Sequence, residues 1–208
     1  MEQIYINVSV EEQSVILFGI KFSDFVENTL TPIDNILLLK SGFLAPKNIR
    51  GFEVLEGHDS ICGLSREDIC GIGDFSFVDY SGDDSVNKLS EEQIAELLYL
   101  AHTHRPLKSA FFDVLKNNFV YLSHDDGWYC KLFCKDVQVS VSIFINTIQK
   151  KIRDFLHDSE YVLCENLVAE IRNLSTKGLI VSLDFSKQQG TEMIQLCEVG
   201  NTTPEDFH

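Results

Sequence analysis

Residues 119–134 read F-V-Y-L-S-H-D-D-G-W-Y-C-K-L-F-C, and this stretch is the strongest indicator of the fold. Two strand-like runs flank Asp126-Gly127, a dipeptide that favours the tight turn of a β-hairpin. The turn and its flanks hold five residues suited to binding: His124, Asp125, Asp126, Trp128 and Tyr129. We therefore expect a working site, if the protein has one, near this turn.

Strand patterns continue outward to both ends of the chain. Alternating apolar and polar residues predict strands over residues 3–10, 14–22, 74–80, 179–185 and 192–199. The first two and the last two of these ranges form hairpins at the two ends. Residues 34–39 form a short apolar run that fits a helix or a strand. Residues 42–73 are expected to be loops with short elements at 49–55 and 65–70.

Helices are expected mainly between the terminal hairpins. Ser90 is a candidate N-cap and Gln93 completes a capping box, so a helix is predicted over residues 91–102. Four of its residues are expected to face the core: Ile94, Leu97, Leu98 and Ala101. Three further helices are expected over residues 110–116, 141–156 and 161–174, with Gly178 as a C-terminal cap.

These elements predict an α+β fold, in which an antiparallel sheet built from hairpins packs against three to four helices. Strands and helices do not alternate regularly, which disfavours a doubly wound nucleotide-binding sheet. We expect residues 1–157 to form the α+β core domain. Residues 158–208 are expected to add a helix and a hairpin packed on the same domain.

Composition limits the classes of function. The 208 residues are 44% hydrophobic, which is enough for a packed core, and carry a formal net charge of −15. This charge repels phosphate backbones, so nucleic-acid binding is not expected. It would attract a basic protein partner, although it also simply favours solubility. Long apolar runs and a secretion signal are missing from the sequence, so we expect a cytoplasmic protein without membrane contact.

The six cysteines are expected to be reduced and buried rather than paired in disulfides. Cys130 and Cys134 lie four residues apart, and on a strand they would be too distant to share a bridge or a metal ion. A nucleophile pair of either cysteine with His124 is one hypothesis. Six cysteines and six histidines give many chance pairings, so the spacing alone does not establish such a site.

A cluster of histidines and aspartates is the one constellation that suggests metal chemistry. His102, His104, His124 and Asp125 supply nitrogen and oxygen donors for a divalent metal, and Asp126 could act as a base. Ordinary roles also fit, since cationic side chains favour helix C-termini and aspartates favour turns. The His-Asp pair resembles that of the HD-domain phosphohydrolases, but there the pair lies on a helix. Motifs for phosphate-binding loops, serine hydrolases and zinc proteases are absent from the sequence.

One resemblance covers about 90 residues. The segments L-S-E-E-Q-I-A-E-L-L-Y-L-A-H at 89–102, R-P-L at 105–107 and Y-L-S-H-D-D-G-W-Y at 121–129 resemble a group of uncharacterised soluble bacterial proteins. Some of these carry the label "oxalate/formate antiporter", which a chain without a membrane span does not support. The resemblance implies no catalytic residues and no cofactor.

The leading hypothesis is a non-enzymatic protein that binds another protein, of an immunity-like or regulatory kind. It depends on the acidic charge, the missing catalytic motifs and the aromatic residues of the 119–134 hairpin. The alternative is a metal-dependent hydrolase that uses the His102, His104, His124 and Asp125 cluster. A third option is a small-molecule site between the helices and the sheet.

Overall fold

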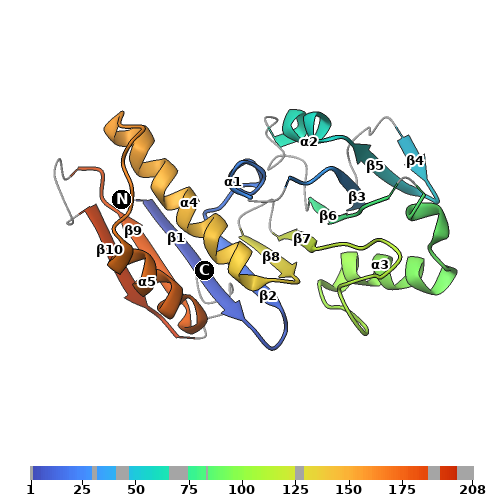
Figure 1. Ribbon diagram of the computed structural model, residues 1–208. Coiled ribbons are helices and arrows are strands. Elements are labelled where there is room, and N and C mark those ends of the chain that lie inside the picture. The colour runs from blue at the N-terminus through green and yellow to red at the C-terminus, as the bar shows by residue number, and fades with distance from the viewer. Residues whose placement is uncertain are drawn as a thin grey trace. The chain divides into compact units, whose positions relative to one another are not determined.

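The computed structural model describes residues 2–29, 32–40, 47–65, 75–82, 84–124, 129–186 and 193–200. Tertiary contacts divide the chain into two compact units. Unit 1 comprises Met1–Leu30 and Val137–His208, and unit 2 comprises Thr31–Asp136. Their elements are labelled in Figure 1, and each unit is described by itself. The expected boundary between residues 157 and 158 stays a prediction.

The sheet of unit 1 is built from the two terminal hairpins, as expected. Its strands are β1 (Glu2–Ser9), β2 (Ser14–Phe18), β9 (Leu179–Leu183) and β10 (Ile194–Glu198). They follow the order β10-β9-β1-β2, and each neighbouring pair is antiparallel. Ile4, Ile6 and Val8 are buried, whereas Val10 lies beyond the end of β1 and is 62% exposed.

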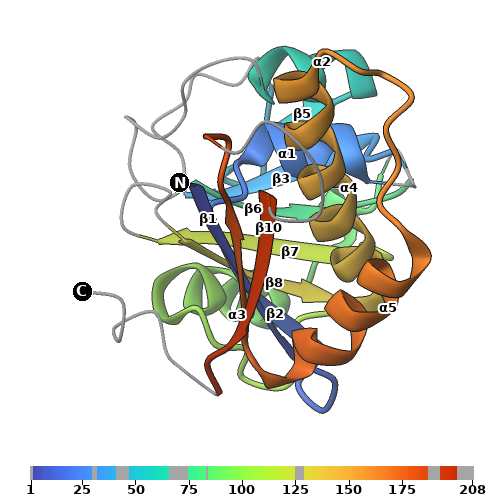
Figure 2. The same ribbon diagram turned by 90° about the vertical axis from the view of Figure 1, so that its left-hand side faces the viewer.

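Helices cover one face of this sheet. Unit 1 contains α1 (Phe22–Asn28), α4 (Val137–Leu156), α5 (Glu165–Leu174) and the short 3₁₀ helix η4 (Ser175–Lys177). Figures 1 and 2 show α4 and α5 on the same side of β1, β9 and β10. The apolar stripe of α4 is buried as far as Ile152, as its helical spacing predicts, whereas Phe155 near the end of the helix is 37% exposed. Gly178 caps η4 with φ +73°, where a left-handed backbone favours glycine.

The sheet of unit 2 contains the decisive hairpin. Its strands are β3 (Asn35–Lys40), β4 (Lys47–Ile49), β5 (Phe52–Glu56), β6 (Ser76–Asp79), β7 (Phe119–His124) and β8 (Tyr129–Cys134). They follow the antiparallel order β8-β7-β6-β3-β5-β4. The pairing of β7 with β8 runs from Phe119 opposite Cys134 to His124 opposite Tyr129, which confirms the hairpin. The open choice for residues 34–39 is resolved as a strand.

Two helices pack on opposite sides of the strands of unit 2 (Figures 1 and 2). Helix α3 (Glu91–Thr103) follows the 3₁₀ helix η2 (Val86–Lys88), and its Leu97, Leu100 and Ala101 are buried. They pack with a row of sheet residues in register: Leu37, Val54, Val78, Val120 and Phe133. Helix α2 (His58–Ser65) buries Ile61 and Leu64. The short element expected at residues 65–70 falls mostly outside the described residues.

Two sequence expectations in unit 2 are wrong. Leu98 is predicted to lie in the core but is 53% exposed. The buried side of α3 consists of Leu97, Leu100 and Ala101, and Leu98 lies on another side of the helix. Residues 110–116 form turns rather than a helix. There the side-chain oxygen of the buried Asn117 accepts the backbone N–H of Phe112 at 2.7 Å. This bond takes the place of the backbone hydrogen bond that the N–H would make in a helix.

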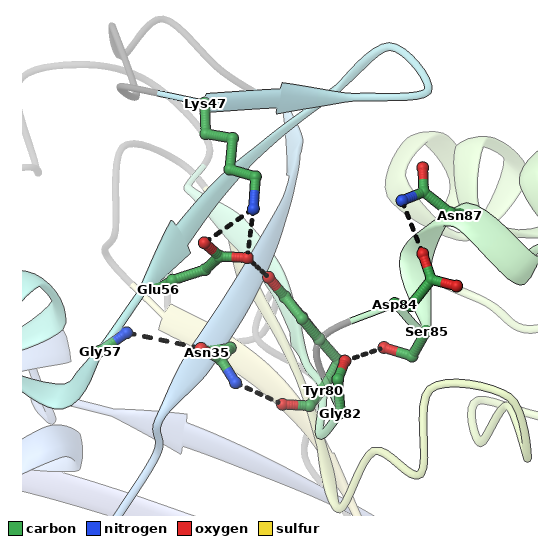
Figure 3. Close-up of polar contacts among 9 residues, drawn as sticks. All are labelled: Asn35, Lys47, Glu56, Gly57, Tyr80, Gly82, Asp84, Ser85 and Asn87. Carbon is green, nitrogen blue, oxygen red and sulfur yellow. Dashed lines mark hydrogen bonds and ion pairs between the residues drawn. The ribbon is translucent and has the colours of Figure 1, made fainter.

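A polar network ties the edge of this sheet together (Figure 3). The ammonium of Lys47 donates to both carboxylate oxygens of Glu56, at 2.7 and 2.8 Å, and thereby lowers the pKa of Glu56. The hydroxyl of Tyr80 donates to the same carboxylate at 3.2 Å. Asn35 donates to the carbonyl oxygen of Tyr80 and accepts the N–H of Gly57. These groups connect β3, β4 and β5 to the end of β6.

The fold class is therefore α+β with antiparallel strands, as predicted. Both units follow the same plan, in which hairpins form a sheet and helices pack on it. No helix in the described part of the chain combines the length and the apolar character that a bilayer crossing needs.

Candidate functional site

The predicted site residue His104 lies at the C-terminal end of α3. Ser90 accepts the N–H of Gln93, and the Gln93 side chain accepts the N–H of Ser90, so the predicted capping box sets where α3 begins. His104 ends the helix in the left-handed conformation, at φ 54° and ψ 26°, while its N–H donates to the carbonyl of Leu100 at 2.8 Å. This cap turns the backbone away from the helix axis directly at the histidine.

His124 lies at the end of β7, opposite Tyr129 at the start of β8. The two rings stack with their centroids 4.4 Å apart and their planes 12° apart. The hairpin register causes this contact, because directly opposed residues present their side chains on the same face. Two of the five predicted binding residues are thus in contact. Asp125, Asp126 and Trp128 lie outside the described residues.

The structure brings His104 and His124 together although 20 residues separate them. Their Nδ1 atoms are 3.0 Å apart, and the ring centroids are 3.8 Å apart with the planes at 77°. Nitrogens at this distance share a hydrogen or face a common ligand. His102, the third predicted metal ligand, is exposed on α3 instead. Among the described residues, no group of three or more His, Cys, Asp or Glu side chains is arranged to hold a metal ion.

A buried carboxylate fixes the other end of β7. Asp79, at the end of β6, is 8% exposed and accepts the backbone N–H groups of Asn118 and Phe119. Burial raises the pKa of this carboxyl to about 6, although the bonds from Phe119 and Asn118 oppose the rise. Asp79 therefore binds the backbone at the start of β7, the strand that ends at His124. Its carboxyl group changes charge near pH 6, within the range of ordinary solution experiments.

The proposed nucleophile pairs with His124 are not supported by the surroundings of the cysteines. Cys130 is 2% exposed, and burial raises the pKa of its thiol to about 12, so it stays protonated at neutral pH. Cys134 is 1% exposed and donates to the carbonyl of Asp136 at 2.8 Å. In the same hairpin, Tyr121 is buried and stacks on Phe77 with the ring centroids 5.3 Å apart.

A different thiol–imidazole pair occurs on α2, a helix that the sequence pattern does not predict. The Nε2 atom of His58 lies 3.3 Å from the Sγ atom of Cys62, and its Nδ1 atom lies 3.3 Å from the carbonyl oxygen of Ile33. The spacing of four residues places the two side chains on the same face of a helix. That spacing was the one signal available, and it becomes informative only after the helix is recognised.

An exposed apolar surface lies on and beside α3. Leu98 is 53% exposed and Tyr99 is 42% exposed, and Leu107 in the following segment is 56% exposed. The ammonium of Lys108 lies 2.6 Å from Glu92 and contacts Glu96, so this segment returns along the helix. We call Leu98, Tyr99 and Leu107 the α3 surface. They are half of the six large hydrophobic side chains found exposed among the described residues.

Unit 1 contains an apolar cavity of about 380 Å³. It lies between the end of α4, the start of α5 and β10, and its lining includes Ile152, Leu156, Tyr161, Leu167 and Met193. Burial raises the pKa of the Tyr161 hydroxyl, so the phenol stays neutral there. The size and lining fit the third expectation, a small-molecule site between the helices and the sheet.

Comparisons of the chain with protein-family models, with curated proteins and with solved structures found no match.

Proposed function

We propose that the protein is a non-enzymatic binding protein for another protein, of an immunity-like or regulatory kind. The observation that supports this proposal is the α3 surface, in which two leucines and a tyrosine are each at least 42% exposed. Exposed apolar side chains are frequent in protein interfaces, and tyrosine is a frequent anchor in them. The proposed anchor therefore lies on α3, while the binding role expected of the hairpin residues stays a prediction.

Charge supports a basic partner. The start of α3 presents Glu91 and Glu92, whose side chains are 88% and 73% exposed. Arg50 and Lys108 pair with these carboxylates, but ion pairs at such exposure contribute little and can exchange. A partner's lysines or arginines could therefore replace them, and the net charge of −15 would speed the encounter.

The test is affinity capture from extracts of the producing cells, with the wild-type chain and two variants as bait. The double variant Leu98→Ser, Tyr99→Ser removes the anchor at exposed positions, where folding is little affected. Val10→Ser is the matched control, because Val10 is 62% exposed and lies in unit 1. The proposal predicts a basic protein that the wild type and the control retain and the double variant loses. If every retained protein also binds the double variant, the proposal is wrong.

A metal-dependent hydrolase is the second candidate, and the contact between His104 and His124 favours it. Two imidazole nitrogens bound to one zinc ion at about 2.0–2.1 Å would lie roughly 3.3 Å apart in tetrahedral geometry. The observed separation of 3.0 Å is close to this value. His104 and His124 are therefore the proposed ligands, and the exposed His102 is omitted. Asp125, the expected further ligand, and Asp126, the expected base, lie outside the described residues.

Elemental analysis of protein purified without chelators tests this candidate. His124→Gln and His104→Gln should lose the metal, and His102→Gln should keep it, with folding checked by circular dichroism. Near-stoichiometric metal in wild type and His102→Gln alone would support the site. Absence of metal from folded wild type after incubation with zinc or manganese would instead assign the histidine contact to a hydrogen bond.

A further inference from the structure

The contacts of His58 define which of its ring nitrogens carries the hydrogen and which one faces Cys62. A backbone carbonyl oxygen accepts hydrogen bonds and cannot donate them, so the contact with the Ile33 carbonyl places the ring hydrogen on Nδ1 of His58. In the neutral ring, Nε2 is then the atom with the free lone pair, and it faces the Cys62 sulfur at 3.3 Å. The imidazole is held in the tautomer that can remove the thiol proton.

Access distinguishes Cys62 from the other described cysteines. Cys130 and Cys134 are buried, which keeps reagents away from them. Cys62 is partly exposed, whereas Cys164 and Cys197 are exposed. Within the described residues, neither Cys164 nor Cys197 has a hydrogen bond to an imidazole, so Cys62 alone of these five combines access with a base.

We propose that Cys62 is a thiol-modification site that reacts with low-molecular-weight disulfides, with His58 as its general base. Nε2 of His58 takes the thiol proton, and the Cys62 sulfur attacks one sulfur of the disulfide. A new S–S bond forms to Cys62 while the S–S bond of the reagent breaks, and the leaving sulfur takes the electron pair. His58 returns its proton to that leaving thiolate. Cys62 is oxidised, and the released thiol is the reduced product.

The position on α2 makes such an adduct compatible with the fold. Ile61 and Leu64 are the apolar residues that α2 buries, and Cys62 lies away from them on the half-exposed side of the helix. The adduct would break the contact between Cys62 and His58 and add bulk to the surface of unit 2. It would be reversible, because a thiol such as dithiothreitol can carry out the same exchange in the opposite direction.

The test uses 2,2′-dithiodipyridine, an uncharged disulfide whose approach the acidic protein does not repel. Peptide mapping by mass spectrometry gives the rate at each cysteine of the native chain. We expect Cys62 to react about three- to tenfold faster than Cys164 and Cys197 at pH 7. In the variant His58→Gln, which cannot take a proton, the rate at Cys62 should fall to that of Cys164.

Two readouts separate a base from a structural contact. The advantage of Cys62 over Cys164 within one wild-type molecule needs no variant and therefore does not depend on whether His58→Gln folds. Lowering the pH from 8 to 6.5 should also slow the reaction of Cys164 more than that of Cys62 in the wild type. In folded His58→Gln, the same change of pH should slow the reactions of the two cysteines equally. Equal rates at Cys62 and Cys164 in the wild type, or a rate at Cys62 that His58→Gln leaves unchanged, would overturn the proposal.

Discussion

The buried carboxylate of Asp79 should make stability depend on pH in the direction opposite to most carboxylates. Paired carboxylates usually have a lowered pKa in the folded state and stabilise proteins at neutral pH. Burial instead raises the pKa of Asp79 from 3.8 to about 6. The perturbation is Asp79→Asn, which removes the charge and keeps an oxygen that can accept the N–H groups of Asn118 and Phe119.

The sign follows from proton binding. Because its folded-state pKa lies above the unfolded value, Asp79 holds a proton in the folded chain at pH values where the unfolded chain has lost it. Its contribution to stability is fully present below pH 3.8 and is lost as the pH rises through about 6. The separation of the two values corresponds to about 3 kcal/mol over the whole window, of which somewhat more than 1 kcal/mol falls between pH 5 and pH 7.5.

The assay is urea unfolding followed by circular dichroism at several pH values from 5 to 7.5. The free energy of unfolding of the wild type minus that of Asp79→Asn should decrease by about 1 kcal/mol or more across this range. Asp113→Asn is the matched control, because Asp113 is exposed in the same unit and its variant should follow the wild type. A difference that stays constant or grows with pH would refute the assignment of a raised pKa to Asp79.

Three further substitutions test the architecture by urea or thermal unfolding. Asn117→Ala leaves the N–H of Phe112 without its acceptor inside unit 2 and should cost about 2 kcal/mol; a loss below roughly 0.5 kcal/mol would contradict the role of this side chain. Gly178→Ala puts a Cβ 1.9 Å from the carbonyl oxygen of Gly200 at φ +73° and should cost about 2 kcal/mol or more, so an unchanged melting temperature would argue against this turn. Ser90→Ala removes the N-cap of α3 and should cost about 1 kcal/mol, which equal unfolding midpoints would exclude.

Elements with strong local signals were predictable. The capping box at Ser90 and the turn at Asp126-Gly127 specify where a helix starts and where a hairpin reverses, without reference to the rest of the chain. Both helix α3 and the β7–β8 pairing agree with those signals. Which side of α3 faces the sheet was less well predicted, because Leu97 and Leu98 are adjacent leucines and only tertiary packing distinguishes them.

Elements whose local signals compete were not predictable. The apolar run near residues 110–116 has helical spacing, but Asn117 satisfies the backbone of Phe112, and Lys116 adopts a positive φ of 52°. The hydrogen bond from a single polar side chain thus favours a turn over a helix in this segment. Helix α2 is the opposite case, a helix that local propensity does not predict. It contains Gly63 and follows Gly57, and glycine has low helix propensity. The helix forms because Ile61 packs inward.

The candidate sites differ in how far the sequence could reveal them. The histidines near the hairpin were visible as a cluster, but choosing His104 over His102 required the left-handed cap at His104, which redirects the chain at that residue. The pair of His58 and Cys62 was hidden because its spacing of four residues has meaning only on a helix. Contacts across a helix turn are invisible until the helix itself is assigned.

Helix α3 links the two functional proposals and also allows them to be separated. Leu98 and Tyr99 lie on its exposed side, whereas His104 contacts His124 at its C-terminal end. A protein-binding role requires the exposed side and is indifferent to metal, while hydrolysis requires the histidines and is indifferent to Leu98. Leu98→Ser, Tyr99→Ser and His124→Gln therefore give opposite patterns for partner capture and metal content. Loss of both properties in both variants, with folding confirmed by circular dichroism, would mean that partner binding and metal binding depend on each other, which would join the two roles in one site.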